Sequence, residues 1–190
     1  FNLALKEGKV DLDIFGSILA DSLNTSLDLD LKLNALQMSF LEIVSDSALR
    51  EAKGFITGDF KVTGSVKEPV YEGAIGFKDV GFLVSQLNTS FNFPDELIKL
   101  DNQAVYFNNF TIKDAEGDSF ITNGRIITEN IADVGFDLKL KTQGFQVMNS
   151  TRKDSDLFFG KANVDLDLQI GGTFSLPMIN TQLKVNEGTE

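Results

Sequence analysis

The feature that most constrains this chain is an internal repeat with a shift of about 108 residues. Residues 64–69 (GSVKEP) recur as residues 172–177 (GTFSLP), and the difference 172 − 64 is 108. Residues 10–18 (VDLDIFGSI) match residues 118–126 (DSFITNGRI), and 118 − 10 is again 108. A duplicated unit that keeps its pattern but not its identities is typical of repeats that stack to lengthen one surface.

Apolar and polar residues alternate along most of the chain. Residues 27–33 (LDLDLKL) and 164–170 (VDLDLQI) alternate without exception, and residues 136–141 (FDLKLK) do the same. This period of two is typical of strands with one buried and one wet face, and it argues against a parallel sheet that is covered on both sides. Glycines fall between the alternating runs, so the sequence predicts an all-β, antiparallel fold with short turns.

Residues 35–45 depart from this period. Their apolar side chains follow the spacing of one helical face, so we expect one short helix there. The counterpart in the second copy, residues 148–156, is polar and is expected to be a loop. Residues 81–103 have no counterpart in the repeat and are expected to add strands to the sheet. Pro69 and Pro177 are each expected to begin a strand, because proline has no amide hydrogen to donate.

No stretch rich in Gly, Ser or Pro separates the two copies, so we expect a single elongated β body over residues 1–190. Within it, the repeat places unit one at about residues 1–80, connecting strands at about 81–108 and unit two at about 109–190. The chain opens on Phe1 and has no leader sequence, which predicts a fragment of a larger protein.

Composition argues against several classes of function. The formal net charge is −11, which argues against nucleic acid and against an anionic membrane surface as partners. The chain has no Cys and no His, so it lacks thiolate chemistry, the commonest general base and the commonest metal ligand. We therefore expect no cofactor and no bound metal.

The acidic residues are better explained as solvent-facing groups than as a catalytic site. The pairs Asp28/Asp30 and Asp165/Asp167 lie at the polar positions of alternating strands, where carboxylates favour solubility. Residues 114–118 (DAEGD) have their glycine in the fourth position, whereas a calcium-binding loop needs it in the sixth, so a turn is expected. We expect no catalytic residue, and the chain is not predicted to be an enzyme.

Two motifs together resemble the TamB family, in its C-terminal region. The first is G-[ST]-x-x-x-P followed by alternating apolar residues, at residues 64–77 and 172–185. The second is F-x-I-x-D-x-x-G at residues 110–117, followed by I-x-x-G-x-I at residues 121–126. AsmA-like and bridge-like lipid-transfer proteins share the broader architecture. The resemblance extends over nearly the whole chain, although Thr181 stands where the first copy has Gly73.

The resemblance implies a long folded sheet, a β-taco, whose concave side is an apolar groove. It further implies a protein in the periplasm of a Gram-negative bacterium, anchored to the inner membrane by a segment outside this sequence. The implied function is phospholipid transfer between the inner and outer membranes. With a TamA-like outer-membrane partner, such a protein also supports the assembly of outer-membrane proteins.

The apolar members of the alternating strands are the candidate groove lining. In an ordinary sandwich they would face a second sheet; in a lipid-transfer protein they would contact phospholipid acyl chains. The alternation leaves both arrangements open, and the resemblance favours the groove. The candidates are Leu27, Leu29, Leu31, Leu33, Phe60, Val62, Ile75, Phe77, Phe136, Leu138, Leu140, Val164, Leu166, Leu168, Ile170, Leu183 and Val185.

Two other functions are compatible with the pattern. An open sheet exposes edge strands that could pair with an extended segment of another protein. The chain would then be a β-augmentation scaffold that binds outer-membrane protein clients without transporting lipid. An enzyme that acts on carbohydrate would instead need two buried carboxylates that converge in a pocket.

Overall fold

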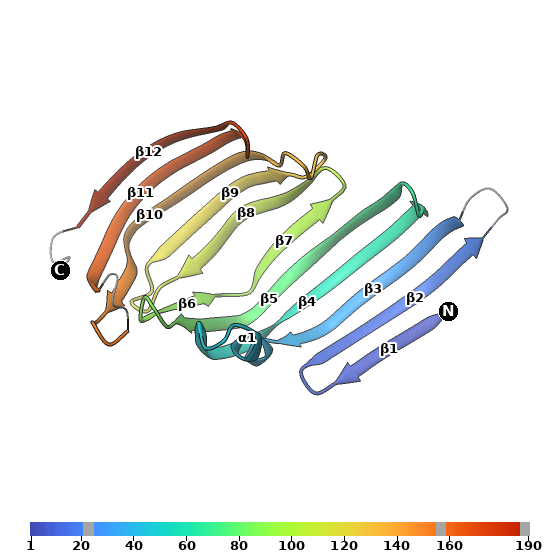
Figure 1. Cartoon of the computed structure of the whole chain (residues 1–190), viewed down its shortest axis with the longest axis horizontal. Helices are drawn as coiled ribbons and strands as arrows, with labels where there is room; N and C mark the ends of the chain where they lie inside the picture. The colour runs from blue at the N-terminus through green and yellow to red at the C-terminus, as the bar shows by residue number, and fades with distance from the viewer. Residues whose placement is uncertain (21–24, 155–158, 187–190) are drawn as a thin grey trace.

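The computed structural model describes residues 1–20, 25–154 and 159–186, which form one antiparallel sheet of 12 strands with one short helix (Figure 1). Strands follow one another across the sheet mostly in chain order, as expected for strands joined by short turns. The all-β, antiparallel prediction is therefore confirmed. Within the described residues, no helix is long and apolar enough to cross a membrane.

The strands divide into two long runs with two short strands between them. The first run is β1 (Asn2–Glu7), β2 (Val10–Ala20), β3 (Thr25–Gln37), β4 (Leu49–Ser65) and β5 (Pro69–Val84). The short strands are β6 (Thr89–Phe93) and β7 (Glu96–Asp101). The second run is β8 (Ala104–Lys113), β9 (Ser119–Ile127), β10 (Gly135–Ser150), β11 (Gly160–Thr173) and β12 (Pro177–Val185). Helix α1 (Ser39–Val44) connects β3 to β4.

Three local predictions are confirmed. Strands β6 and β7 are the extra strands expected within residues 81–103. Pro69 and Pro177 are the first residues of β5 and β12, where no ladder donor is lost. Residues 114–118 form the turn between β8 and β9, in which the Gly117 amide donates to the Asp114 carbonyl oxygen at 3.3 Å.

The predicted helix over residues 35–45 is only partly right. Residues 35–37 continue β3, because Leu36 pairs with Val10 on one side and with Ile56 on the other. The helix begins only at Ser39. The loop predicted over residues 148–156 is likewise partly wrong. Residues 148–150 extend β10 by pairing with β11, residues 151–154 form a turn, and residues 155–156 lie outside the described residues.

The sheet has no second layer in the described part of the chain. Elements that are not neighbours in the sheet meet extensively only where α1 packs on β3 and β4 and where β6 approaches β10. Five apolar residues are buried in the described chain, namely Met38, Val80, Ala104, Phe110 and Phe145, and Ala104 lies away from both contacts, at the start of β8. The accessible surface is 11,899 Å². A compact monomer of 20.9 kDa would expose about 9,000 Å². The two-sheet sandwich is therefore not the fold of these residues.

Several strands are irregular at one level of the sheet, which we call the crease and define by Gly54, Asp79 and Gly144. All three residues have positive φ, of 78°, 49° and 70°. Pairing shifts register beside Gly54 in β4 and beside Gly144 in β10. The turn between β8 and β9 lies at this level. Asp118 of that turn is close to Gly144, because a methyl group added to Gly144 would lie 3.3 Å from the Asp118 carboxylate. Bulges of this kind bend strands and increase their twist.

Strand pairing at the two ends of the sheet follows the same register. Leu27 lies opposite Gly64 in the first run, and Phe136 lies opposite Gly172 in the second. Turn glycines also correspond, because Gly64 and Gly172 have φ of 86° and 78°. The sequence shifts between these positions are 108 for the glycines (172 − 64) and 109 for their partners (136 − 27).

Gly16 and Gly124 mark a second corresponding position, where neighbouring strands approach closely. Their φ values are 137° and 113°, in the region that favours glycine. An added Cβ would collide with the backbone oxygen of the next strand, that of Asp28 for Gly16 and that of Asp137 for Gly124.

We expect Gly124→Ala to destabilise the sheet. The left-handed backbone alone costs about 1–3 kcal/mol for a non-glycine residue, and the collision with Asp137 adds to this cost. Gly171→Ala is the matched control, because its methyl group would meet Met178 Cε at 3.6 Å and the Phe136 carbonyl oxygen at 3.9 Å, both ordinary contacts. The shift in urea midpoint measures the difference, and equal midpoints for both variants would contradict the close approach.

Candidate functional site: the apolar face of the sheet

The candidate residues share one face of the sheet. Directly opposed residues of antiparallel strands point to the same side, so the register can be followed from strand to strand. Leu33 lies opposite Gly58, which lies opposite Ile75, which lies opposite Ile98. Leu100 lies two residues after Ile98 in β7 and so points to the same side. It lies opposite Val105, which lies opposite Ile126, which lies opposite Phe136. We call the side occupied by the candidate residues the apolar face.

The apolar face is not covered by other parts of the described chain. Of the candidate residues, all but two are half-buried, and none is fully buried. The two exceptions, Leu183 and Val185, lie in edge strand β12 and are 60% and 56% exposed. Side chains on neighbouring strands can half-bury one another even when no second layer packs on the sheet. The apolar face is therefore partly exposed to solvent in the described structure.

Phenylalanine rings pack against one another on the apolar face beside the crease. Adjacent ring centroids lie 5.4–6.4 Å apart, in stacked, tilted and edge-on geometries. Phe110 and Phe145 are the most buried members, at 6% and 4% exposure. We call this set the aromatic cluster: Phe77, Phe82, Phe91, Phe93, Phe107, Phe110, Phe120 and Phe145.

Sequence reasoning identified only Phe77 from this cluster. The available signal was the count of 17 Phe in a chain with no Trp. That count indicated a need for apolar surroundings but did not indicate which rings would meet.

One pair of positions offers a steric reason for the departure from the predicted repeat at Thr181. The ring of Phe60 lies over the backbone of Gly73 and Gly58, and an added methyl group on either glycine would overlap it. In the second copy, Thr181 lies opposite Leu168, at the positions equivalent to Gly73 and Phe60. Leucine leaves room for a Cβ on its partner, so the two changes are linked.

The opposite side, which we call the polar face, carries paired charges. Lys61 contacts Asp28 at 2.6 Å and Asp30 at 3.0 Å, and these hydrogen bonds, that to Asp28 above all, raise the pKa of the Lys61 ammonium. Lys141 contacts Asp167 at 2.7 Å. These side chains are 38–64% exposed, so each pair contributes little stability.

The hollows on the polar face do not contain the carboxylate arrangement that carbohydrate chemistry would need. One is lined by groups including Asp30, Lys61, Glu72 and Lys99, in which positive and negative charges alternate. The carboxylates of Asp28, Asp30 and Asp167 face water as well as lysine. Among the residues that the structure describes, no three acidic side chains come together as metal ligands.

We expect Phe110→Ala to lower the free energy of unfolding by about 3–5 kcal/mol, because it leaves a cavity among buried rings. Phe174→Ala is the matched control, since this ring is 75% exposed at the turn between β11 and β12 and should cost less than about 0.5 kcal/mol. Urea unfolding compares the two variants. A loss as large for Phe174→Ala would show that the aromatic cluster is not the buried centre.

Comparison with known proteins gives one match. Residues 108–190 match the family model described as the TamB C-terminal domain. Searches of curated proteins and of solved structures each returned no match.

The match begins within β8 and covers β9 to β12, with the turn at residues 114–118 and the second G-[ST]-x-x-x-P motif. The TamB family comprises structural and transport proteins, which confirms the expectation that this chain is not an enzyme. Residues 108–190 are therefore similar to the C-terminal domain of the TamB family.

Proposed function

We propose that this chain is a segment of a periplasmic TamB-like protein whose apolar face binds phospholipid acyl chains during transfer between the inner and outer membranes. The observation that carries the proposal is the continuous apolar face, which runs over the sheet and is uncovered. The candidate residues listed above would line the groove, and the bend at the crease would make it concave.

The exposed area supports an apolar ligand. The chain exposes roughly 2,900 Å² more than a compact monomer of its mass. The uncovered apolar face contributes to this excess, and a large exposed apolar patch is unfavourable in water unless something covers it. Each buried methylene contributes about 0.8 kcal/mol, so a 16-carbon tail would gain on the order of 10 kcal/mol.

The size of the sheet supports transfer along it. Ten steps between the neighbouring strands from β1 to β12, at about 4.8 Å each, give roughly 50 Å across the strands. One leaflet of a bilayer contributes about 15 Å of hydrocarbon, half of the roughly 30 Å core. The apolar face would therefore hold more than one lipid in a row.

The repeat gives this surface a simple origin. Equivalent cross-strand pairs and turn glycines at both ends support two units, about residues 1–80 and 109–190, which flank connecting strands over about 81–108. Stacking the units in one sheet would lengthen a single groove in one body, with no separate domain at either end.

The family match supports the cellular setting. TamB proteins are periplasmic, are anchored to the inner membrane and act with TamA in outer-membrane biogenesis. We infer that this chain shares that location and a TamA-like partner, with the anchor in a segment outside this sequence. Support of outer-membrane protein assembly would follow from the same partnership.

A β-augmentation scaffold remains the second candidate, and the edge strands favour it. Every residue of β1 and of β12 is exposed in the described structure. An extended client segment could pair with either strand through backbone hydrogen bonds. In this alternative, outer-membrane protein clients bind at the edges and no lipid is transported.

Photo-crosslinking in cells tests the leading proposal with adjacent residues that point to opposite faces. In the full-length protein, crosslinkers at Leu29 and Leu168 should capture phospholipid, whereas those at Asp28 and Asp167 should not. Crosslinkers in β1 and β12 report on the scaffold alternative. Capture of client polypeptide at the edges, with no lipid at Leu29 or Leu168, would replace the lipid proposal with the scaffold.

We expect Leu29→Asp and Leu168→Asp to reduce co-purifying phospholipid at least five-fold, because each places a charge among the acyl chains. Both side chains are half-buried, so folding should be largely retained. Asp167→Asn on the polar face is the matched control and should keep its lipid. Native mass spectrometry measures the bound lipid, and unchanged lipid in both leucine variants would contradict the proposal.

A further inference from the structure

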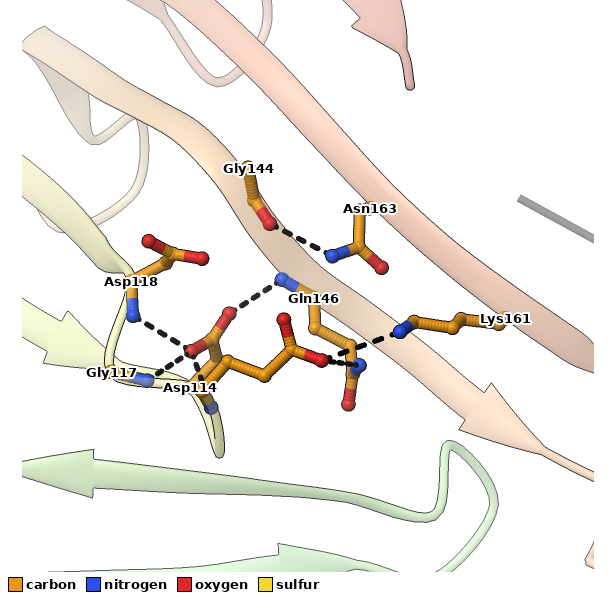
Figure 2. A network of polar contacts seen from close by, with 8 residues as sticks. Asp114, Gly117, Asp118, Gly144, Gln146, Lys161 and Asn163 are labelled. Atoms are coloured by element: carbon orange, nitrogen blue, oxygen red, sulfur yellow. Dashed lines mark hydrogen bonds and ion pairs between the residues drawn. The ribbon is translucent and has the colours of Figure 1, made fainter. Parts of the chain in front are cut away.

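Asp114 is a buried carboxylate held by backbone amides from two separate segments. Its side chain is 2% exposed. One carboxylate oxygen accepts hydrogen bonds from the amides of Glu116, Gly117 and Asp118 at 3.0, 2.8 and 2.9 Å (Figure 2). The other accepts the amide of Gln146 in β10 at 2.7 Å. Asp114 has no ion pair among the described residues, so these four amides are its principal compensation for burial.

The turn that Asp114 closes lies where the two long runs of strands meet. Strands β8 and β9 end at the crease, and beyond the tip of their hairpin β6 comes close to β10 (Figure 1). There the Asn149 amide donates to the Leu87 carbonyl oxygen at 2.9 Å. The rings of Phe91 and Phe145 stack at 5.8 Å. Between β5 and β10, the described sheet thus holds three strands (β7, β8 and β9) before the crease and β6 alone beyond it.

The equivalent turn at the start of the chain shows that the carboxylate is not needed for the turn itself. At a shift of 109, Gly8 corresponds to Gly117 and Leu5 to Asp114. Leu5 is 47% exposed in edge strand β1, and the β1–β2 turn forms without any such carboxylate. Of the two turns, aspartate is found only in the β8–β9 turn, whose tip lies between other strands.

We propose that the Asp114 carboxylate is a clasp that holds the β8–β9 hairpin against β10 and thereby fixes the bend of the sheet at the crease. The three turn amides orient the carboxylate, and the Gln146 amide joins it to the second run of strands. The bond lies next to Gly144, whose positive φ marks the irregularity in β10. This inference rests on the fold alone and is independent of lipid binding.

A surface contact runs parallel to the clasp. Glu116 accepts hydrogen bonds from the Gln146 side-chain amide and from Lys161, both at 3.3 Å, at about half exposure. Because this contact is longer and solvated, we assign it little influence on the bend. It therefore supplies a control at the same place in the fold.

Asp114→Asn separates the two functions of the carboxylate. The amide oxygen of Asn can still accept the three turn amides, but its NH₂ group would face the Gln146 amide, which is also a donor. The turn should persist while the link to β10 is lost. Asp114→Ala removes both, and if that variant fails to fold, the Asn variant still tests the proposal.

Hydrogen–deuterium exchange on the whole chain measures the local effect. In Asp114→Asn, exchange at the Gln146 amide should rise at least ten-fold, while the Gly117 and Asp118 amides stay protected. Spin labels at the exposed residues Lys67, in the β4–β5 turn before the crease, and Lys153, in the β10–β11 turn beyond it, should show a broader distance distribution than in the unmodified chain. Glu116→Gln should change neither measurement.

Two results would overturn the proposal. Unchanged exchange at Gln146 would show that the carboxylate does not hold β10. Faster exchange with an unchanged distance distribution would show that it holds the hairpin without setting the bend. An equal response in Glu116→Gln would assign the effect to lost charge and would also reject the clasp.

Discussion

The structure depends on hydrogen bonding and side-chain pairing between neighbouring strands, because almost nothing packs on top of the sheet. In most domains the apolar face of a sheet is buried against a second layer. Here each strand is stabilised chiefly by the strand before it and the strand after it. Stability of this kind is approximately a sum over nearest neighbours, as in repeat proteins, which lets the sheet be lengthened without redesign of a central core.

Such a sheet needs something more where it bends, and the crease supplies it. The aromatic cluster includes two of the five buried apolar residues of the described chain, Phe110 and Phe145, and it lies beside the irregular strands. Asp114 adds a polar contact that is also distant in sequence, because it joins a hairpin tip to Gln146 in β10, 32 residues further along the chain. Side-chain packing is therefore concentrated at the crease, where the pairing of strands is irregular. The rest of the apolar face stays uncovered in the described structure.

The two faces are kept distinct by different chemistry. On the polar face, exposed carboxylates alternate with lysines and form pairs such as Lys61 with Asp28 and Lys141 with Asp167. These favour solubility more than stability. On the apolar face, close contacts constrain which residue can stand opposite which, as the exchange of Phe60 and Gly73 for Leu168 and Thr181 illustrates.

The sequence by itself determined the strands, their antiparallel pairing, the two strand-initiating prolines and the face to which each alternating residue points. These follow from a period of two and from the missing amide hydrogen of proline, which are local properties. The tertiary structure alone decided three things. Leu36 continues β3 because its partners lie in β2 and β4; eight phenylalanines meet because bulged strands converge; and Asp114 is buried because Gln146 approaches it. Each depends on residues far apart in the chain, whose meeting no local pattern encodes.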